Sequence, residues 1–351
     1  MQRTAQELAQ KPRISRLVEI DALRGVAALA VVLFHYTARF DELFGHRPPP
    51  AISFSGGHYG VNLFFIISGF VIFMTLEKTS KPMDFVVSRF SRLFPAYWTA
   101  IVLTFLLTHL LGLPGKLVDL ATAFGNLVMI HGLLFRIPHV DGVYWTLEVE
   151  LLFYCGMLGL FCLRRLGKVH HVLLGLLALR LANFFGQRNF GIELPWTVYR
   201  ILILTFIPWF ALGISIYLAT SRHGGASWRP PALTASCAIL TLLLTESLFI
   251  ATLAIALASL VFLAANGRLA LLRHRLFVWL GAISYPLYLL HENIGWSLQL
   301  QLQALGVPTD ATILLVLATS LALATAITRW VEQPALLWIR TRYRNRLAFA
   351  K

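Results

Sequence analysis

Charged residues are scarce in this sequence: Asp, Glu, Lys and Arg make up 13% of the 351 residues, whereas 58% are hydrophobic. A soluble domain of this length has too little interior to hide so much apolar surface. Apolar runs close to the length that a bilayer-crossing helix needs, about 20 residues, recur along almost the whole chain. The composition therefore excludes a soluble protein and predicts an all-α, polytopic integral membrane protein.

Cysteine is also scarce, with three residues in the whole chain. Cys155, Cys162 and Cys237 all lie in predicted spans and show no CxxC spacing. Zinc sites built from cysteine need such spacing. We therefore expect no disulfide and no bound metal.

Acidic residues are about half as frequent as basic ones, 16 against 30, which gives a formal charge of +14. We predict about ten transmembrane helices, at residues 20–40, 59–77, 94–113, 143–163, 169–186, 198–220, 232–248, 250–266, 276–298 and 311–331. With this topology, 21 Lys and Arg lie on the side of the termini and 6 on the opposite side. The positive-inside rule then places both termini in the cytoplasm and explains the positive charge without nucleic acid.

Three segments follow from this topology. Residues 1–19 form a polar cytoplasmic segment without the small-residue cleavage site of a signal peptide, so we expect it to stay in the mature protein. Residues 20–339 form the transmembrane domain, and residues 340–351 form a basic cytoplasmic tail. Within the outer stretch 114–142, residues 117–135 are counted as non-spanning, because a span there would destroy the charge asymmetry. Whether that part is interfacial, re-entrant or spanning stays open.

Ionisable side chains are costly inside a bilayer, so each one is a functional candidate. His35, Glu150 and His291 come from three distant parts of the chain and are predicted at a similar depth, in the outer halves of their spans. The alternative for each histidine is a hydrogen-bonded packing role between helices.

Arg24 lies eleven residues before His35, which corresponds to about three helical turns plus 20° and a rise of about 16 Å. The two side chains therefore share one face of the first span, which reaches from the cytoplasmic interface deep into the membrane. Arg24 alone is also explained as a cationic side chain that extends to the interface.

Arg89 and Arg92 are three residues apart in "RFSR" and share a helix face on the cytoplasmic side. Two guanidinium groups suit a ligand that carries phosphate, and anionic lipid headgroups fit the same charge. Glu148 and Glu150 point about 200° apart on a helix, so at most one of them faces a shared site.

Six motifs occur in order along the chain: the Arg24 and His35 pair, "YGVNLFFIISGFVI", "SRFSRLFPAYW", "WTLEVELLFY", "ISYPLYLLH" and "VEQP". Together they resemble the membrane-bound acyltransferase 3 family, whose bacterial members O-acylate surface glycans. The sequence departs from the family pattern at Asn62, where many members have Asp, and at Leu151, where a second Glu often follows the family glutamate. We also expect no esterase-like domain of the kind that some members carry.

The resemblance implies transfer of an acyl group, with acetyl expected, from cytosolic acetyl-CoA to a hydroxyl of a saccharide or glycolipid acceptor at the outer side of a bacterial inner membrane. Membrane lipids are further partners, nucleic acid is not, and a homo-oligomer stays open. We expect His35 and Glu150 to be catalytic and Arg24, Arg89 and Arg92 to bind the donor. The expected lining of the site is Asn62, Ser68, Trp145, Ser284, Tyr285 and His291.

His35 is the best candidate for a general base, because an imidazole accepts a proton near neutral pH. A covalent acyl-histidine intermediate is a second route that the sequence leaves open. Glu150 would orient the imidazole or bind acceptor hydroxyls.

Two other classes of function are compatible with the same spans. A transporter or flippase of an anionic or glycolipid substrate would use the intramembrane His and Glu as a proton relay. A non-catalytic assembly protein would bind a lipid-linked glycan without a covalent product. The transporter hypothesis does not explain the cytoplasmic RxxR together with Arg24 and His35 on one face, and binding that is indifferent to CoA would favour the assembly protein.

Overall fold

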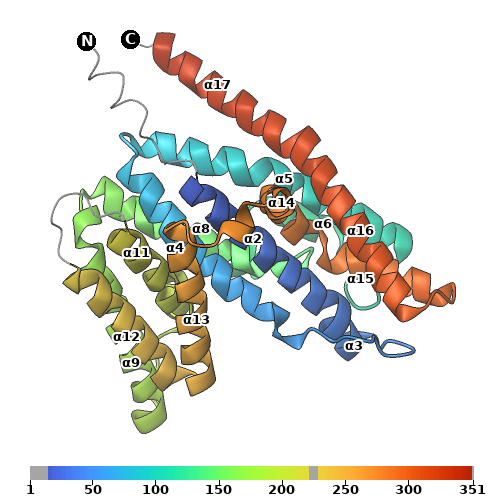
Figure 1. Cartoon of the computed structure of the whole chain (residues 1–351), viewed down its shortest axis with the longest axis horizontal. Coiled ribbons are helices and arrows are strands. Elements are labelled where there is room, and N and C mark those ends of the chain that lie inside the picture. The colour runs from blue at the N-terminus through green and yellow to red at the C-terminus, as the bar shows by residue number, and fades with distance from the viewer. Residues whose placement is uncertain (1–14, 221–227, 350–351) are drawn as a thin grey trace.

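The computed structural model describes residues 15–220 and 228–349, which form helices and connecting segments and no strand (Figure 1). The first half of the chain contains α2 (Ser15–Phe34), α3 (Phe40–Leu43), α4 (Gly60–Glu77), α5 (Pro82–Leu111), α6 (Leu120–Gly125), α7 (His131–Phe135) and α8 (Trp145–Cys162). The second half contains α9 (Val169–Phe190), α10 (Trp196–Ile201), α11 (Ile207–Thr220), α12 (Arg229–Thr245), α13 (Leu248–Ala265), α14 (Arg275–Leu290), α15 (Glu292–Ala304), α16 (Thr309–Ile327) and α17 (Gln333–Phe349).

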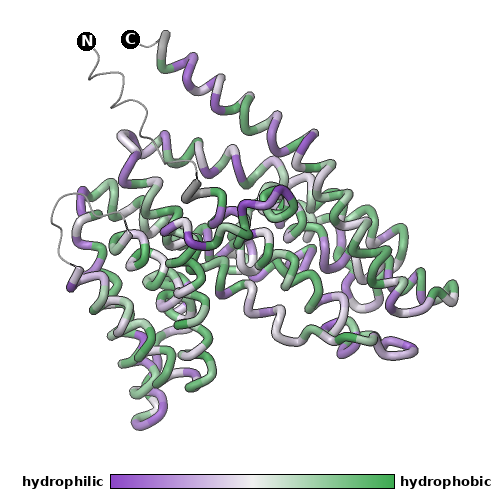
Figure 2. Tube along the Cα trace, viewed as in Figure 1, coloured by the Kyte–Doolittle hydropathy of each residue, from purple (hydrophilic) through white to green (hydrophobic). Residues whose placement is uncertain are grey.

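Six helical segments of the described residues are long and apolar enough to cross a membrane, as the hydropathy colouring of Figure 2 illustrates. They are Ser55–Glu77, Pro82–Leu111, Gly142–Cys162, Leu166–Phe190, Leu248–Ala265 and Thr309–Leu347, and shorter apolar helices are Ile207–Thr220, Arg229–Thr245 and Arg275–Leu290. The chain is therefore a multi-pass membrane protein with an all-helical fold. The total of ten spans and the side of the termini stay predictions.

Two helices differ from the expected boundaries in ways that matter for the site. The predicted span 276–298 is two helices, α14 and α15, which meet at His291. Residues 82–93, which precede the predicted span 94–113, are the first turns of the continuous helix α5. Arg89 and Arg92 consequently lie on the same rigid element as the span that follows them.

The stretch 114–142 contains only two short helices, α6 and α7, of six and five residues. Neither is long enough to cross a bilayer, which takes about 20 residues. The stretch is tied to α5, because Tyr97 OH donates to the carbonyl of Asn126 and Trp98 Nε1 donates to that of Leu127. In this structure it packs on the bundle without spanning it.

Glycines set the closest helix contacts. At the crossing of α2 and α14, a Cβ on Gly25 would collide with the backbone of Gly281, and one on Gly281 would collide with the carbonyl of Asp21. Small residues at a membrane helix interface let two backbones approach closely. At the crossing of α4 and α11, a Cβ on Gly69 would collide with the backbone of Phe210, and one on Gly213 would collide with the carbonyl of Ile66. These crossings hold together the helices that surround the site.

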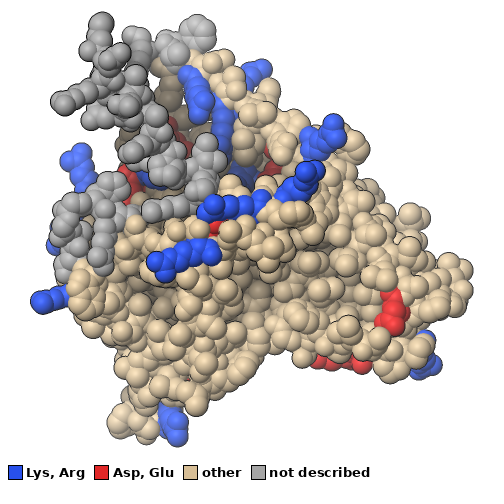
Figure 3. Space-filling view, viewed as in Figure 1, with Lys and Arg blue, Asp and Glu red and all other residues tan. Residues whose placement is uncertain are grey.

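Figure 3 shows how the basic side chains are distributed on one face of the molecule. Lys and Arg gather toward its upper part, on the side where α17 ends, while uncharged residues cover the broad middle. A few charged residues appear at the opposite tips. A broad uncharged band with basic residues mainly on one side is the distribution expected for a protein embedded in a bilayer.

The α2 and α14 crossing yields a stability prediction. Gly281→Ala places a methyl group against the Asp21 carbonyl, and such overpacking costs about 1–3 kcal/mol. Gly175→Ala is the matched control, because nothing lies within 4 Å of a Cβ at that helical position. Thermal unfolding of the detergent-purified protein should show a lower midpoint for Gly281→Ala and an equal or higher one for Gly175→Ala. Equal midpoints for both variants would contradict the backbone contact.

Candidate active site

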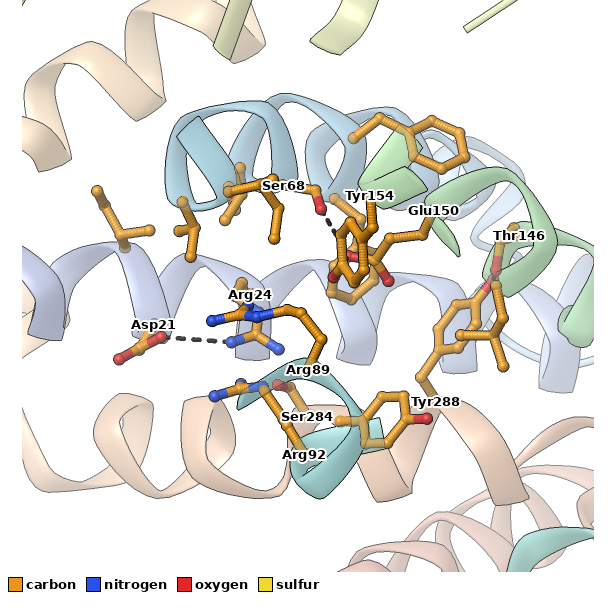
Figure 4. Close-up of a pocket in the computed structure, with 18 of the residues that line it drawn as sticks. Asp21, Arg24, Ser68, Arg89, Arg92, Thr146, Glu150, Tyr154, Ser284 and Tyr288 are labelled. Carbon is orange, nitrogen blue, oxygen red and sulfur yellow. Dashed lines mark hydrogen bonds and ion pairs between the residues drawn. The ribbon is translucent and has the colours of Figure 1, made fainter. Parts of the chain in front are cut away.

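A cavity of about 230 Å³ lies between α2, α4, α5, α8 and α14 (Figure 4). Its lining is apolar at many positions, but side chains with polar groups converge on it from all five helices. These are Asp21, Arg24, Ser68, Arg89, Arg92, Thr146, Glu150, Tyr154, Ser284, Tyr285 and Tyr288. A concave site with a few convergent polar groups is the usual form of a ligand-binding or active site.

Three guanidinium groups, from Arg24 of α2 and from Arg89 and Arg92 of α5, occupy one end of this cavity and lie close together in Figure 4. Arg24 contacts Asp21 at 3.4 Å, and its side chain is 17% exposed. The buried Nε of Arg89 has no hydrogen-bond partner among the described residues. A group of arginines with unused donors is a binding site for a multiply charged anion.

Glu150 of α8 lies deeper in the cavity. Its Oε1 accepts hydrogen bonds from Ser68 Oγ and from Tyr154 OH, each at 2.5 Å. The carboxylate is thereby held in one orientation by two helices, α4 and α8 itself. Its hydrogen-bond partners in this structure are hydroxyl groups and not a histidine.

A second cluster contains both predicted histidines. His291 Nε2 lies 3.1 Å from His35 Nδ1, and His291 Nδ1 lies 2.9 Å from the carbonyl of Tyr288. Because that carbonyl only accepts, Nδ1 of neutral His291 carries the proton and Nε2 of His291 is the acceptor. The donor to it is His35 Nδ1–H, which also faces the Val31 carbonyl at 2.9 Å. This leaves a lone pair on His35 Nε2.

The carboxylate next to that lone pair belongs to Glu292, whose Oε2 lies 3.4 Å from His35 Nε2. The two side chains are 14% and 7% exposed. When His35 takes up a proton at Nε2, Glu292 lies beside the new N–H and stabilises the imidazolium by its opposite charge. The geometry supports a general base at His35 Nε2.

Backbone irregularities and buried hydrogen bonds position this cluster. His35 begins a π-helical turn, His35–Arg39, and its carbonyl accepts from Trp296 Nε1 at 2.9 Å. π-helical turns are frequent at functional sites. On the other side, the Asp141 carboxylate accepts from the backbone N–H of Asn293 at 3.0 Å and fixes the start of α15. Burial raises the pKa of Asp141.

Tyr288 links the cavity to the histidine cluster. It lines the cavity, and its ring centroid lies 5.7 Å from that of His291. Its hydroxyl is 2.9 Å from Thr146 Oγ1, a second lining group. His35 and His291 do not themselves line the cavity, so Tyr288 and Thr146 lie at the boundary between the two parts of the site.

Most of the residues singled out from the sequence converge on this region. The cavity lining includes Arg24, Ser68, Arg89, Arg92, Glu150, Ser284 and Tyr285, and the adjoining cluster includes His35 and His291. Asn62 and Trp145 do not line the cavity, and the Trp145 ring packs against Phe65 and Phe206.

Sequence reasoning did not select several residues that the structure places at the site: Asp141, Tyr154, Tyr288, Glu292 and Trp296. Two of them, Glu292 and Asp141, carry a local signal that could have revealed them. Glu292 directly follows His291, and Asp141 is an acidic residue just before an apolar span. The partners of Trp296 and Tyr288 are set by tertiary contacts, which no local pattern encodes.

Comparison with protein families matches residues 17–329 to the family described as "Acyltransferase domain". The chain is similar to "Protein 2 in picA locus" of Rhizobium radiobacter, with 35% identity over 32% of this chain and 58% of that protein. It is also similar to "Exopolysaccharide production protein ExoZ" of Rhizobium meliloti (strain 1021), with 28% identity over 52% of this chain and 55% of that protein. The matches thus span a little over half the length of these curated relatives.

No solved structure matches the chain. The family match covers most of the chain, from the start of α2 to the π-helical turn before α17, and includes every residue of the cavity and of the histidine cluster. The chain therefore belongs to the acyltransferase 3 domain family.

Proposed function

We propose that this protein is a membrane enzyme that transfers an acyl group, acetyl in the first instance, from acyl-CoA to a hydroxyl group of a saccharide or glycolipid. The observation that carries the proposal is a single cavity with three arginines at one end. At its other end Tyr288 lies next to the cluster of His35, His291 and Glu292. Family membership supports acyl transfer. The relative named as an exopolysaccharide production protein supports a saccharide acceptor.

Coenzyme A fits the arginine end by charge. Its phosphate groups accept charge-assisted hydrogen bonds from guanidinium groups, and arginine binds phosphate in a bidentate manner. Arg24, Arg89 and Arg92 come from two different helices, α2 and α5, so they approach a ligand from two directions. A bound anion also compensates their charge inside the low-dielectric bundle.

The chemistry takes place where the cavity meets the histidine cluster. The acceptor oxygen attacks the thioester carbonyl, and its proton passes to His35 Nε2. The C–S bond then breaks, and the CoA thiolate takes up the proton from the imidazolium. Glu292 stabilises the imidazolium between these two steps.

Glu150 has a separate task in this scheme. Held by Ser68 and Tyr154, it lies in the cavity between the arginines and the Tyr288 boundary. There its carboxylate accepts hydrogen bonds from hydroxyl or amide groups of a bound substrate. Ser284 and Tyr285 complete the polar lining on the α14 side.

The proposed orientation places the arginine end toward the cytoplasm, where acyl-CoA is available, and both termini on the same side. The acceptor then meets the histidine cluster from the outer side of a bacterial inner membrane. The basic connector before α5, with Lys78 and Lys81, supports this orientation through the positive-inside rule.

Donor binding is the first test. Arg89→Gln should weaken acetyl-CoA binding at least tenfold, because it removes one guanidinium from the anion site. Arg346→Gln, an exposed arginine on α17, is the charge-matched control and should bind like the native chain. Thermal shift of purified protein titrated with acetyl-CoA measures both. Equal binding by the two variants would overturn the assignment of the arginine end.

Transfer is the second test. His35→Gln should lower transfer of radiolabelled acetyl from acetyl-CoA to a saccharide acceptor by about 10²–10⁴-fold, the usual contribution of a general base. Acetyl-CoA binding should persist, because His35 does not line the cavity. His171→Gln, at an exposed position, is the control and should keep full transfer.

Retained transfer in His35→Gln would rule out its role as the base. A native chain that forms no acylated product, yet couples proton movement to uptake of an anionic or glycolipid substrate, would favour the transporter hypothesis. The chain of titratable groups from His291 through His35 to Glu292 would then serve as its proton relay.

A further inference from the structure

A second group of histidines lies outside the cavity and takes no part in the proposed chemistry. His131 begins α7, His139 lies in the segment that follows α7, and Glu148 is in the first turn of α8. One potential ligand atom from each of the three side chains lies within 4.8 Å of the others. His131 is fully buried and Glu148 is 1% exposed.

Both rings present a buried nitrogen without a partner. His131 Nδ1 lies 2.9 Å from the carbonyl of Val128, so it carries the proton and leaves the lone pair on Nε2. That Nε2 and the Nδ1 of His139 are buried and have no hydrogen-bond partner among the described residues. The ring centroids are 4.6 Å apart, with the planes nearly perpendicular. Burial lowers the pKa of both rings, that of His139 to about 4.

The carboxylate is fixed by its own hydrogen bonds. Glu148 Oε1 accepts from the backbone N–H of Gly132 at 2.6 Å and of Leu133 at 3.3 Å, and Oε2 lies 3.4 Å from Arg200. A side chain at Gly132 would press on the Glu148 carboxylate and on the His139 ring. The glycine therefore keeps open the space in which the three groups meet.

We propose that His131, His139 and Glu148 bind one divalent transition-metal ion, with zinc as the best match. Two neutral imidazoles and one carboxylate form a common zinc ligand set, and a water or another small ligand completes a tetrahedron. The Val128 carbonyl and the Gly132 N–H are the outer partners that hold such ligands in place. Ligand atoms around tetrahedral zinc lie about 3.4 Å apart, so binding draws the three groups closer together.

The expectation of no metal site, drawn from the sequence, rested on the spacing of the cysteines. This set contains no cysteine, and its ligands are spaced 8 and 9 residues apart, so no standard zinc motif reveals it. The short segment between α7 and α8 folds back and brings the histidines onto the first turn of α8.

The metal would act as a clamp between the stretch 126–141 and α8. The same stretch supports the proposed active site, because the Val140 carbonyl accepts from Asn293 Nδ2 at 2.8 Å and Asp141 accepts from Asn293 N–H. Asn293 directly follows Glu292, the carboxylate beside His35. Metal binding therefore stabilises the side of the histidine cluster that this stretch holds.

Metal content tests the site without any assay of transfer. The full chain, purified in detergent and freed of any polyhistidine tag, is treated with chelator, reloaded with one equivalent of zinc and desalted. Inductively coupled plasma mass spectrometry then measures zinc per chain. We expect about one zinc for the native chain and for His109→Ala, an exposed histidine on α5, and at least tenfold less for His131→Ala and His139→Ala.

Glu148→Gln covers the case in which a histidine variant does not fold, because the amide oxygen still accepts from Gly132 and Leu133. Zinc should raise the thermal unfolding midpoint of the native chain by several degrees and that of Glu148→Gln by much less. The site is refuted if the native chain retains no zinc, or if the folded histidine variants retain as much as His109→Ala. Because neither readout uses an acyl donor, failure here is distinct from failure of the proposed transfer activity.

Discussion

The cost of burying guanidinium groups in a helix bundle is the constraint on which the rest of the structure depends. Arg24, Arg89 and Arg92 would lose less hydration if they separated toward water, yet they converge on one cavity. The close contact of Gly25 with Gly281 lets α2 lie directly against α14, which also lines the cavity. The glycine contact thus helps to form the same cavity in which the three arginines lie, and a bound anion would balance their charge.

The second part of the site depends on two interruptions of regular helix. α14 ends and α15 begins at His291, and α2 passes into a π-helical turn at His35. Each interruption exposes backbone groups, and the hydrogen bonds of Trp296 and Asp141 satisfy some of them. The two imidazoles meet there with a single consistent proton arrangement that leaves the lone pair of His35 facing Glu292. A regular helix at either position would direct these side chains elsewhere.

The membrane class could be predicted from the sequence because long apolar runs recur along it. The arginines and the two histidines stand out locally, as ionisable side chains within or next to those runs. The spacing of Arg24 and His35 needed only helix geometry. The contact of Glu292 with His35 could not be predicted in this way, since it joins residues more than 250 positions apart through the packing of α15 on the π-helical turn. The His131 cluster was missed for another reason: the segment between α7 and α8 is irregular and has no periodicity to detect. The number of spans and their orientation stay predictions.

The most direct test of the central claim is a structure of the full chain in lipid nanodiscs, determined by electron cryomicroscopy with a non-hydrolysable acetyl-CoA analogue. The account predicts density for the ligand phosphates within hydrogen-bond distance of Arg24, Arg89 and Arg92, and the acyl end next to Tyr288, on the side of His35. Analogue bound at another surface, or a cavity that stays free of density at saturating ligand, would contradict the assignment of this cavity as the donor site.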